Sequence, residues 1–418
     1  MNTAYLKSYW KEIVAGIIIV LYLIANAHND NDLRIFMAAS RDLIDGESIY
    51  LIKYKEWFHY YYSVLFALLM YPLALLPDYI ATTVWMAANM YFAWRTWKII
   101  CSFLPVESLD PKLLRLFSFI VFVFMLRFIT DNLRYGQMTI FILYLALEGI
   151  NQIQNKRNVL GGSLIALSIN IKLLPIVLLP YLLYRGQYKA TIYALIAFFV
   201  FLILPGLFIG YDYHFALLQD RWNLLNPSNP EHLLDVSERS FHSITTLLAT
   251  LLLENAGNVH SMDLKRNIMN LSAEHLGMVI NIARVIFIGA TLYFLKAAPF
   301  KVEKDRVQVL YELSYILLVI PLIFPHQQQY AFYFAFPAVT YLVYYFVQSF
   351  FNNEWKKPAL GYGVMALFFM GYLLMSSTFI LGEFRSYYDH YKVLTYGVFI
   401  LIGLLAYCRP QGLEKRTY

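Results

Sequence analysis

The feature that most constrains this chain is the recurrence of long apolar stretches along its whole length. Each is about 15 to 25 residues long, close to the ~20 residues that a helix needs to cross a bilayer. Only 14% of the 418 residues are charged, against ~25% in soluble domains. The sequence therefore predicts an all-α polytopic membrane protein with about 12 transmembrane helices. It argues against a soluble enzyme, a disordered protein and a nucleic-acid binder.

Little of the chain remains outside this membrane region. About 12 spans would use more than half of the residues, so we expect residues 1–418 to form a single transmembrane domain with a few sizeable loops. The net charge of +6 sits mainly in short loops, where it indicates orientation. Cys101 and Cys408 lie far apart in or beside apolar segments and predict neither a disulfide framework nor a zinc site.

Basic residues in the loops predict which helix ends face the cytoplasm. Lys7 and Lys11 precede the first apolar run, residues 13–27. This start has some features of a signal peptide, but we favour a retained first helix with a cytoplasmic N-terminus. Cytoplasmic loops are then expected at residues 156–157, 185–189, 301–306, 356–357 and 409–416. The outer side is expected to carry residues 131–137, 211–277, 326 and 383–391.

The apolar stretch 159–184 has basic flanks on both sides, so one crossing would place a flank on the wrong side. A hairpin of two half-length helices meeting around Asn170, Lys172 and Pro175 resolves this, because proline breaks a helix and the break can line a cavity. Lys172 would lie at its tip; the alternative is one helix with a snorkelling lysine. Residues 61–130 hold three apolar segments. The expected sides of their flanks require an even number of crossings, so one segment does not cross, and which one stays open.

Two long polar stretches are expected on the outer side. The first, residues 28–60, predicts an amphipathic helix on the membrane surface that ends at Gly46 and has an apolar face of Leu33, Phe36, Met37, Leu43 and Ile44. The second, residues 211–276, contains the loop signal NPSNPEH and the run SFHSITTLLATLLL. That run is short for a span and is expected to be interfacial.

Ionisable residues at membrane depth are costly and are functional candidates by default. The expected topology places the candidates around one outer cavity: Asp30, Asp32, His59, Arg134, Gln137, Lys172, Arg239, His242 and His326. The cations favour an anionic ligand such as phosphate, and a carboxylate beside them can act as a general base. Each residue alone is equally well explained by lipid contact, capping or hydrogen bonding, so the grouping carries the prediction.

The Asp30-Asn31-Asp32 sequence resembles a metal-binding pair of acids. Magnesium requires more oxygen ligands than this pair supplies, so we predict no metal centre and no other cofactor, with a divalent ion as the less favoured alternative. No glycine-rich phosphate loop, HExxH or GxSxG pattern indicates an ATP-driven pump or a hydrolase.

Six segments follow one another in an order typical of one family. DLRIFMAASRDLIDGESIY, YPLALLP, YGQMTIFILYLAL and GGSLIALSINIKLLPIVLLPYLLYRGQYKA span the first half of the chain, and SERSFHSITTLL and IFPHQQQYAFYFAFP match loosely in the second. The set resembles the GT-C membrane glycosyltransferases, and more narrowly glycosyltransferase family 87, the polyprenyl-phosphate-mannose-dependent mannosyltransferases. Three places depart from the family pattern: Phe36 replaces a usual Tyr, FHYYYSVLF replaces a Tyr-Pro-Pro stretch, and Glu238-Arg239 stands for Asn-Gln.

The resemblance implies a GT-C fold and an inverting transfer of a sugar, mannose, from polyprenyl phosphate to a hydroxyl of a lipid or glycan acceptor. Asp32 would be the catalytic base. The leaving phosphate would need positive charge and hydrogen-bond donors, for which the candidates in falling order are Lys172, Arg239, Arg134 and Gln137. His326 and His59 would orient the acceptor or the phosphate, and His242 and Asp30 complete the expected substrate-binding set.

By analogy with the family, the enzyme would act on the periplasmic side of a bacterial inner membrane, among membrane lipids. A transporter or lipid flippase is the first alternative, but it predicts inverted repeats and ionisable residues near the midplane, and we find no repeat. A glycan polymerase or ligase is the second; Arg239 and His242 would suit it, whereas the DLRIF loop so soon after the first helix argues against it.

Overall fold

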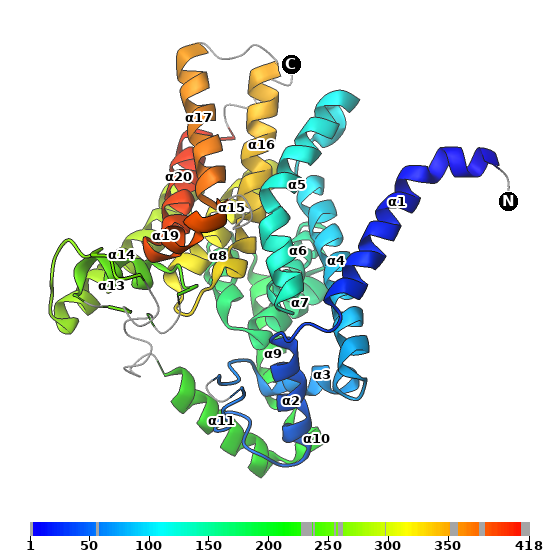
Figure 1. Ribbon diagram of the computed structural model, residues 1–418, viewed down its shortest axis with the longest axis vertical. Coiled ribbons are helices and arrows are strands. Elements are labelled where there is room, and N and C mark those ends of the chain that lie inside the picture. Colours follow the sequence, from blue (N-terminus) through cyan, green and yellow to red (C-terminus); the bar gives the residue numbers. More distant parts are fainter. Residues whose placement is uncertain are drawn as a thin grey trace.

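The computed structural model of the protein describes residues 3–55, 58–226, 236, 239–254, 256–257, 262–296, 298–351, 358–375 and 381–410. Over these residues the fold is all helical, apart from two isolated β-bridges (Figure 1). The first part of the chain forms α1 (Thr3–Asn26), α2 (Leu33–Ile44), α3 (Val64–Ala74), α4 (Asp78–Ser102), η1 (Val106–Ser108), α5 (Pro111–Arg134) and α6 (Thr139–Gln154).

The middle forms α7 (Asn158–Ile171), η2 (Leu174–Val177), α8 (Leu178–Tyr184), α9 (Tyr188–Ile203), α10 (Gly206–Ile209), α11 (Tyr211–Leu225), α13 (Ile244–Leu252) and α14 (Ala273–Leu295). The last part forms α15 (Arg306–Ile323), η4 (Gln329–Ala335), α16 (Phe336–Phe351), α17 (Pro358–Met375), η5 (Gly382–Phe384), α19 (Arg385–His390) and α20 (Val393–Tyr407). Local signals set several helix starts. Asp110, for example, accepts a hydrogen bond from the Lys112 backbone N–H (3.1 Å), with Pro111 in the first turn.

The described helices mark the chain as an integral membrane protein. Five are long and apolar enough to cross a membrane: α5, α9 with α10, α14, α15, and η4 with α16. The number rises to seven if each of two bent pairs is one span, namely α3 with α4, and η5 and α19 with α20. The expected number of about 12 spans and the GT-C fold stay predictions. Several apolar helices, such as α7, are shorter than a span.

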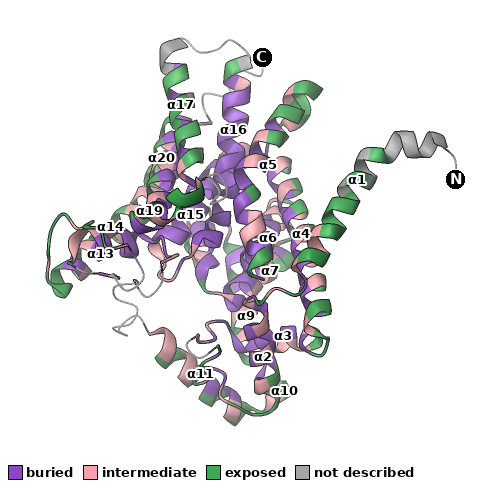
Figure 2. Ribbon diagram, viewed as in Figure 1, coloured by how far each residue is buried: buried purple, intermediate pink, exposed green. Residues whose placement is uncertain are grey.

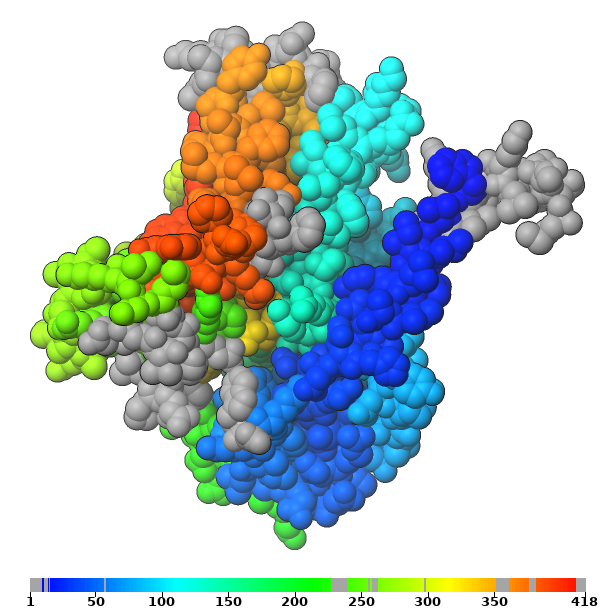
Figure 3. Space-filling model, in the orientation of Figure 1, coloured from blue at the N-terminus to red at the C-terminus, as the bar shows by residue number. Residues whose placement is uncertain are grey.

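Burial separates a central group of helices from an outer one (Figure 2). In the most apolar stretch of each helix, 78% of the residues are buried in α15 and all of them in η4–α16. Only 17% are buried in α9 with α10 and in α14. Because large apolar faces are not left in contact with water, the exposed faces of α9 and α14 are suited to lipid. Figure 3 shows that α1 projects from the body of the molecule. Its side chains Ile18, Leu21 and Ile24 are each at least 60% exposed.

Of the apolar segments between residues 61 and 130, α3 is too short to cross a membrane alone. α3 has 11 residues, about half of the ~20 that a span requires. It is bent by 118° from α4 and packs against α2. Ser40 Oγ of α2 donates to the Ala67 carbonyl of α3 (2.7 Å), which fixes α3 against α2.

The predicted break near Lys172 is confirmed. α7 ends at Ile171, Lys172 is extended, and Pro175 lies in η2. α7 and α9 are parallel, since Gly162 near the start of α7 meets Ala190 and Ala194 near the start of α9, and Asn170 Nδ2 donates to the Phe198 carbonyl (3.3 Å). η2 and α8 therefore lead the chain back, which places Lys172 at the tip of a hairpin.

The helix predicted in residues 28–60 is present as α2, and Gly46 follows it with a φ of +84° that favours glycine; its place on the membrane surface stays a prediction. Leu33, Phe36, Met37 and Leu43 are buried as one face, whereas Ile44, assigned to that face, is 44% exposed. The interfacial helix expected in residues 211–276 corresponds to α13, which has nine residues. Most of its loop signal NPSNPEH lies outside the described residues.

Basic loops that were expected in the cytoplasm lie together at one end of the molecule. Arg185 Nε donates to Glu312 Oε2 (2.9 Å), and its Nη2 to the Leu295 carbonyl (3.3 Å). Arg306 Nη2 donates to Asn151 Oδ1 (2.8 Å) at the end of α6. The segments 356–357 and 411–416 lie outside the described residues.

Candidate active site

Asp32 lies at the start of α2, directly after the loop that follows α1. Its backbone N–H donates to the Tyr135 carbonyl (3.1 Å), and its half-buried carboxylate accepts from Gln137 Nε2 (2.6 Å from Oδ2). The carboxylate does not cap its own helix. It is therefore held by the turn between α5 and α6.

Gly136 explains how that turn reaches Asp32. Its φ is +65°, and a Cβ there would lie 2.8 Å from the Leu33 Cβ and 3.1 Å from the Asn31 Cγ. Both the left-handed backbone and the lack of space require glycine. The turn consequently packs directly on the start of α2, and Gln137 is brought to the Asp32 carboxylate.

Asp30 lies on the outside of the same loop. Its side chain is 63% exposed and pairs with Lys55 (2.9 Å) and Arg34 (3.7 Å). Lys55 Nζ also donates to the Asn31 carbonyl (3.3 Å). In the part of the chain that the structure describes, no three His, Cys, Asp or Glu side chains are grouped to hold a metal ion. Whether the enzyme uses a metal stays a prediction.

The environment of Asp32 makes it a better base than an ordinary aspartate. Burial raises the pKa of its carboxyl, and this outweighs the opposing influence of Lys55 and the hydrogen bond from Gln137. A half-buried carboxylate with a raised pKa is suited to proton abstraction.

Lys172, at the hairpin tip, is linked to the first turn of α2 through two aromatic rings. Its Nζ lies over the ring of Tyr62, 5.5 Å from the centroid. Tyr62 in turn meets Phe36 of α2 edge-on, with 4.8 Å between the ring centroids. Phe36 and Tyr62 come from two of the segments that depart from the family pattern, and the structure brings them into contact.

His326 and His59 flank a third aromatic ring beside this site. His326 stacks on Tyr61 (6.0 Å between centroids, 15° between planes), and His59 meets Tyr61 at 6.3 Å. His326 also meets Phe241 at 5.4 Å, next to a β-bridge between Phe241 and Gln328. The two loosely matching segments of the second half are thus joined to the Tyr61–Tyr62 segment.

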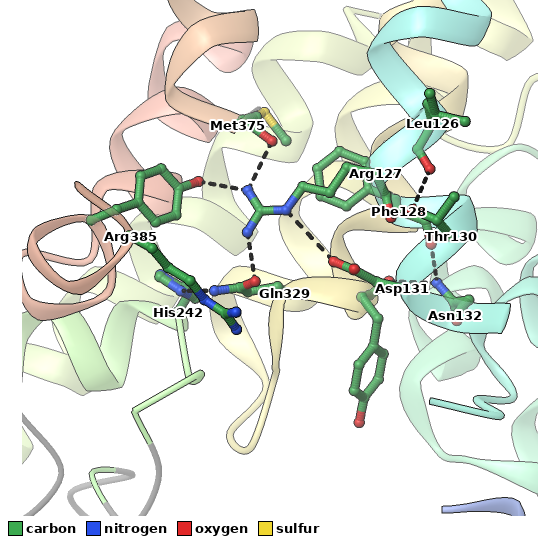
Figure 4. Close-up of polar contacts among 12 residues, drawn as sticks. Leu126, Arg127, Phe128, Thr130, Asp131, Asn132, His242, Gln329, Met375 and Arg385 are labelled. Atoms are coloured by element: carbon green, nitrogen blue, oxygen red, sulfur yellow. Dashed lines mark hydrogen bonds and ion pairs between the residues drawn. The ribbon is translucent and has the colours of Figure 1, made fainter. Parts of the chain in front are cut away.

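His242 belongs to a second, neighbouring network centred on Gln329 (Figure 4), and Arg239 joins it through Asp389. The Gln329 amide accepts from Arg127 Nη2 (2.5 Å) and donates to Asp389 Oδ1 (2.7 Å), with His242 Nε2 at 3.3 Å. Arg239 and Arg385 pair with the same aspartate, at 3.7 and 3.8 Å from Oδ2. Burial lowers the pKa of His242 to about 4, so its imidazole is neutral at pH 7 and the arginines balance Asp389.

The structure therefore divides the predicted site residues into two groups. Asp32 and Gln137 are in contact, Lys172 is linked to α2 through Tyr62 and Phe36, Asp30 borders Asp32 through Lys55, and His59 and His326 flank Tyr61. Arg239 and His242 join the second network. Arg134 is exposed, 5.9 Å from the ring of its neighbour Tyr135, and has no described contact with Asp32. It points away because it lies on the outward side of the last turn of α5.

Gln329 was noted in the sequence only as a neighbour of His326. Sequence reasoning missed Lys55, Tyr62, Arg127, Asp389 and Tyr388, whose hydroxyl accepts a hydrogen bond from Arg127 (3.0 Å). Arg127 had a usable signal, since it is an arginine within the apolar run of a predicted span. Lys55 and Tyr62 lie in a polar, aromatic loop and have no such local signature.

The described part of the chain thus combines apolar helices suited to a membrane with a half-buried carboxylate, Asp32, that is held by a turn from another part of the chain. The chain belongs to glycosyltransferase family 87, whose sequence model matches residues 60–300, more than half of the chain. It is thus a membrane glycosyltransferase, with a sugar donor and an acceptor. The matched region includes Tyr62, Gln137 and Lys172, and the Asp32 loop precedes it. No curated protein matches the chain.

Proposed function

We propose that the protein transfers mannose from a polyprenyl-phosphate donor to a hydroxyl of a lipid or glycan acceptor, with inversion and without a metal, on the periplasmic face of a bacterial inner membrane. The observation that carries the proposal is the arrangement at the hairpin tip. There Lys172 lies over the ring of Tyr62, and Tyr62 packs on Phe36 in the first turn of α2, directly after the half-buried Asp32 that Gln137 holds.

The arrangement supports a single displacement. Asp32 takes the proton of the acceptor hydroxyl while its oxygen forms a bond to the anomeric carbon of the sugar. The bond from that carbon to the phosphate oxygen breaks, and the lipid phosphate leaves with the electron pair. Lys172 stabilises the negative charge that grows on the leaving oxygen, so no general acid is needed. Attack from the opposite face inverts the anomeric configuration.

The exposed apolar helices suit a donor whose tail lies in the bilayer. The test uses purified protein in detergent, short-chain polyprenyl phosphates that carry mannose, glucose or galactose, and a pool of lipid and glycan acceptors. Mass spectrometry would show a hexose added to an acceptor with the mannosyl donor. Transfer only from another donor sugar, or only from a nucleotide sugar, would overturn the donor assignment.

The transfer rate is expected to fall at acidic pH. Because the base must be ionised, and because burial raises the pKa of Asp32, the acid limb should have its midpoint above the ordinary value near 4. Gln137→Leu removes a hydrogen bond that favours the ionised form. It should move the midpoint upward by about 0.5 to 1 pH unit, since such a bond contributes about 1 kcal/mol. A downward shift would contradict this role of Gln137.

Lys172→Met should weaken the use of the donor. A charge-assisted contact with phosphate contributes about 1.5 to 3 kcal/mol, which predicts a roughly 10- to 100-fold lower kcat/KM for the polyprenyl-phosphate sugar. Lys189→Met removes the same charge from an exposed position beyond the other end of the hairpin and should change kcat/KM less than twofold. Equal effects of the two variants would argue against a phosphate contact at Lys172.

A further inference from the structure

The helix α11 begins where a membrane-spanning segment ends. The apolar stretch of α9 and α10 is long enough to cross a bilayer and ends at Ile209. Gly210, with a φ of +86°, then turns the chain into α11, which runs across this end of the molecule and packs against α3 (Figure 1). Because a span ends at the bilayer surface, α11 starts at that level.

One side of α11 carries an exposed aromatic stripe, formed by Tyr211, Phe215 and Trp222. Their side chains are 43, 56 and 66% exposed. At about 100° per residue, the three positions lie within about 40° of one another around the helix axis. The rings of Tyr211 and Phe215 stack, with 6.3 Å between centroids. The aromatic stripe is therefore a single surface.

The aromatic stripe continues the exposed surface of the span before it. Leu207 and Phe208 of α10 are 67 and 73% exposed. The Tyr211 ring lies against Gly206 of α10, where a Cβ would be 2.5 Å from the Tyr211 Cδ1, so no side chain separates α10 from the start of the stripe. Since the exposed face of α9 and α10 is suited to lipid, the continuous surface on α11 fits the same lipid.

The rest of α11 differs from the aromatic stripe. Asp212, Gln219 and Asn223 are exposed and lie about 60 to 100° around the helix from the middle of the stripe. His214 and Leu217, on another side, are buried against the protein. An aromatic side next to a polar side suits the boundary between lipid and water, because tyrosine and tryptophan rings favour the level of the lipid head groups.

α11 is also bonded to the end of α2. The Tyr213 hydroxyl donates to the carbonyls of Glu47 (2.5 Å) and Leu43 (3.3 Å). Ser48 Oγ donates to Asp220 Oδ2 (2.6 Å) one and a half to two turns further along α11. The position of α11 therefore determines where the C-terminal end of α2 is held.

We propose that α11 lies in the membrane interface, with the aromatic stripe among the lipid head groups and the polar side in water, and that it fixes the end of α2 at this surface. The partner of the stripe is the lipid surface itself. This role follows from the membrane location of α9 and is independent of the sugar-transfer reaction.

The test places a nitroxide spin label at single cysteines of the full-length protein, with both native cysteines changed to alanine. The protein is reconstituted into vesicles of phosphatidylethanolamine and phosphatidylglycerol. Phe215→Cys and Trp222→Cys report on the stripe. Ala216→Cys and Asn223→Cys are the matched controls, because each is the exposed next residue, about 100° further around the helix. The measurement is the collision rate of each label with oxygen, which concentrates in lipid, and with a water-soluble nickel complex.

The labels at 215 and 222 should collide mainly with oxygen, at a depth of about 5 to 10 Å in the boundary between head groups and acyl chains. The labels at 216 and 223 should collide mainly with the nickel complex. Equal access of the nickel complex to all four labels would overturn the proposal, because the stripe would then face water. Low access of both reagents to 215 and 222 would also overturn it, because a second copy or another protein would then cover the stripe.

A measurement without labels applies if a cysteine variant does not fold. The fluorescence of Trp222 is obtained as the difference between wild type and Trp222→Phe in the same vesicles. Lipids with brominated acyl chains should quench this difference signal, whereas acrylamide in the water should quench it weakly. Strong quenching by acrylamide alone would contradict a position in the lipid.

The bond between α11 and α2 is tested with a spin label at Glu47→Cys. Tyr213→Phe/Ser48→Ala removes the donors to Glu47 and Asp220 while it leaves the aromatic stripe intact. The label should become more mobile in this variant, and the depth of a label at 222 should stay the same. An unchanged mobility would show that α11 does not fix the end of α2.

Discussion

Asp32→Asn is expected to lower the rate of sugar transfer about 10²- to 10⁴-fold while the protein remains folded. Asparagine has the same shape as aspartate, and its carbonyl can still accept the hydrogen bond from Gln137. What is lost is the ability to take a proton, and a positioned general base contributes about 10²- to 10⁴-fold to a rate. The measurement is the initial rate of transfer, with donor binding measured in parallel.

Asp45→Asn is the matched control, because Asp45 is an exposed aspartate at the other end of the same helix. It should keep the wild-type rate. Retention of more than a tenth of the wild-type rate by Asp32→Asn would exclude Asp32 as the base. Loss of donor binding together with loss of rate would indicate that Asp32 positions the substrate.

Arg127→Met is expected to produce the largest loss of stability. Arg127 is 4% exposed and joins four segments through hydrogen bonds to Gln329, the Tyr388 hydroxyl (3.0 Å) and the Met375 carbonyl (3.1 Å). Removing one member of a buried charged network leaves its partners unpaired and costs about 3 to 5 kcal/mol. Asp131, 3.6 Å from Arg127 Nε, would lose a cationic partner as well.

Thermal unfolding in detergent micelles measures this effect. Arg115→Met, an exposed arginine in the first half of the same helix α5, provides the control and should change the midpoint by no more than about 1 °C. An equal loss of stability in both variants would show that the network contributes little. Arg127→Lys keeps the charge but not the planar fork, so it should recover only part of the lost stability.

Features with a local signature were predicted well from the sequence. The helix α2 was predicted from its apolar spacing and from Gly46. The break at Lys172 was predicted from a proline and from basic flanks on both sides. Both depend on residues that are close in sequence. The family resemblance was also confirmed, although its motifs are individually weak.

The partition of the candidate site could not be predicted in this way. Arg127 and Gln329 are 202 positions apart, and Asp32 and Gln137 are 105 apart. The expected topology placed all candidates on one side of the membrane. The packing of α2, α5 and the segment 326–329 separates the Asp32 group from the Asp389 group. Arg239, ranked second as a phosphate ligand, was assigned by its side of the membrane, and the structure places it beside Asp389.

The hairpin made by α7 and α8 has a consequence for the order of the remaining helices. It begins and ends at the same end of the molecule, so α9 starts where α7 started and runs in the same direction. Lengthening or shortening it symmetrically moves its tip without inverting any helix from α9 onward. The position of Lys172 along the bundle is therefore set by the length of α7, independently of the direction of the helices that follow.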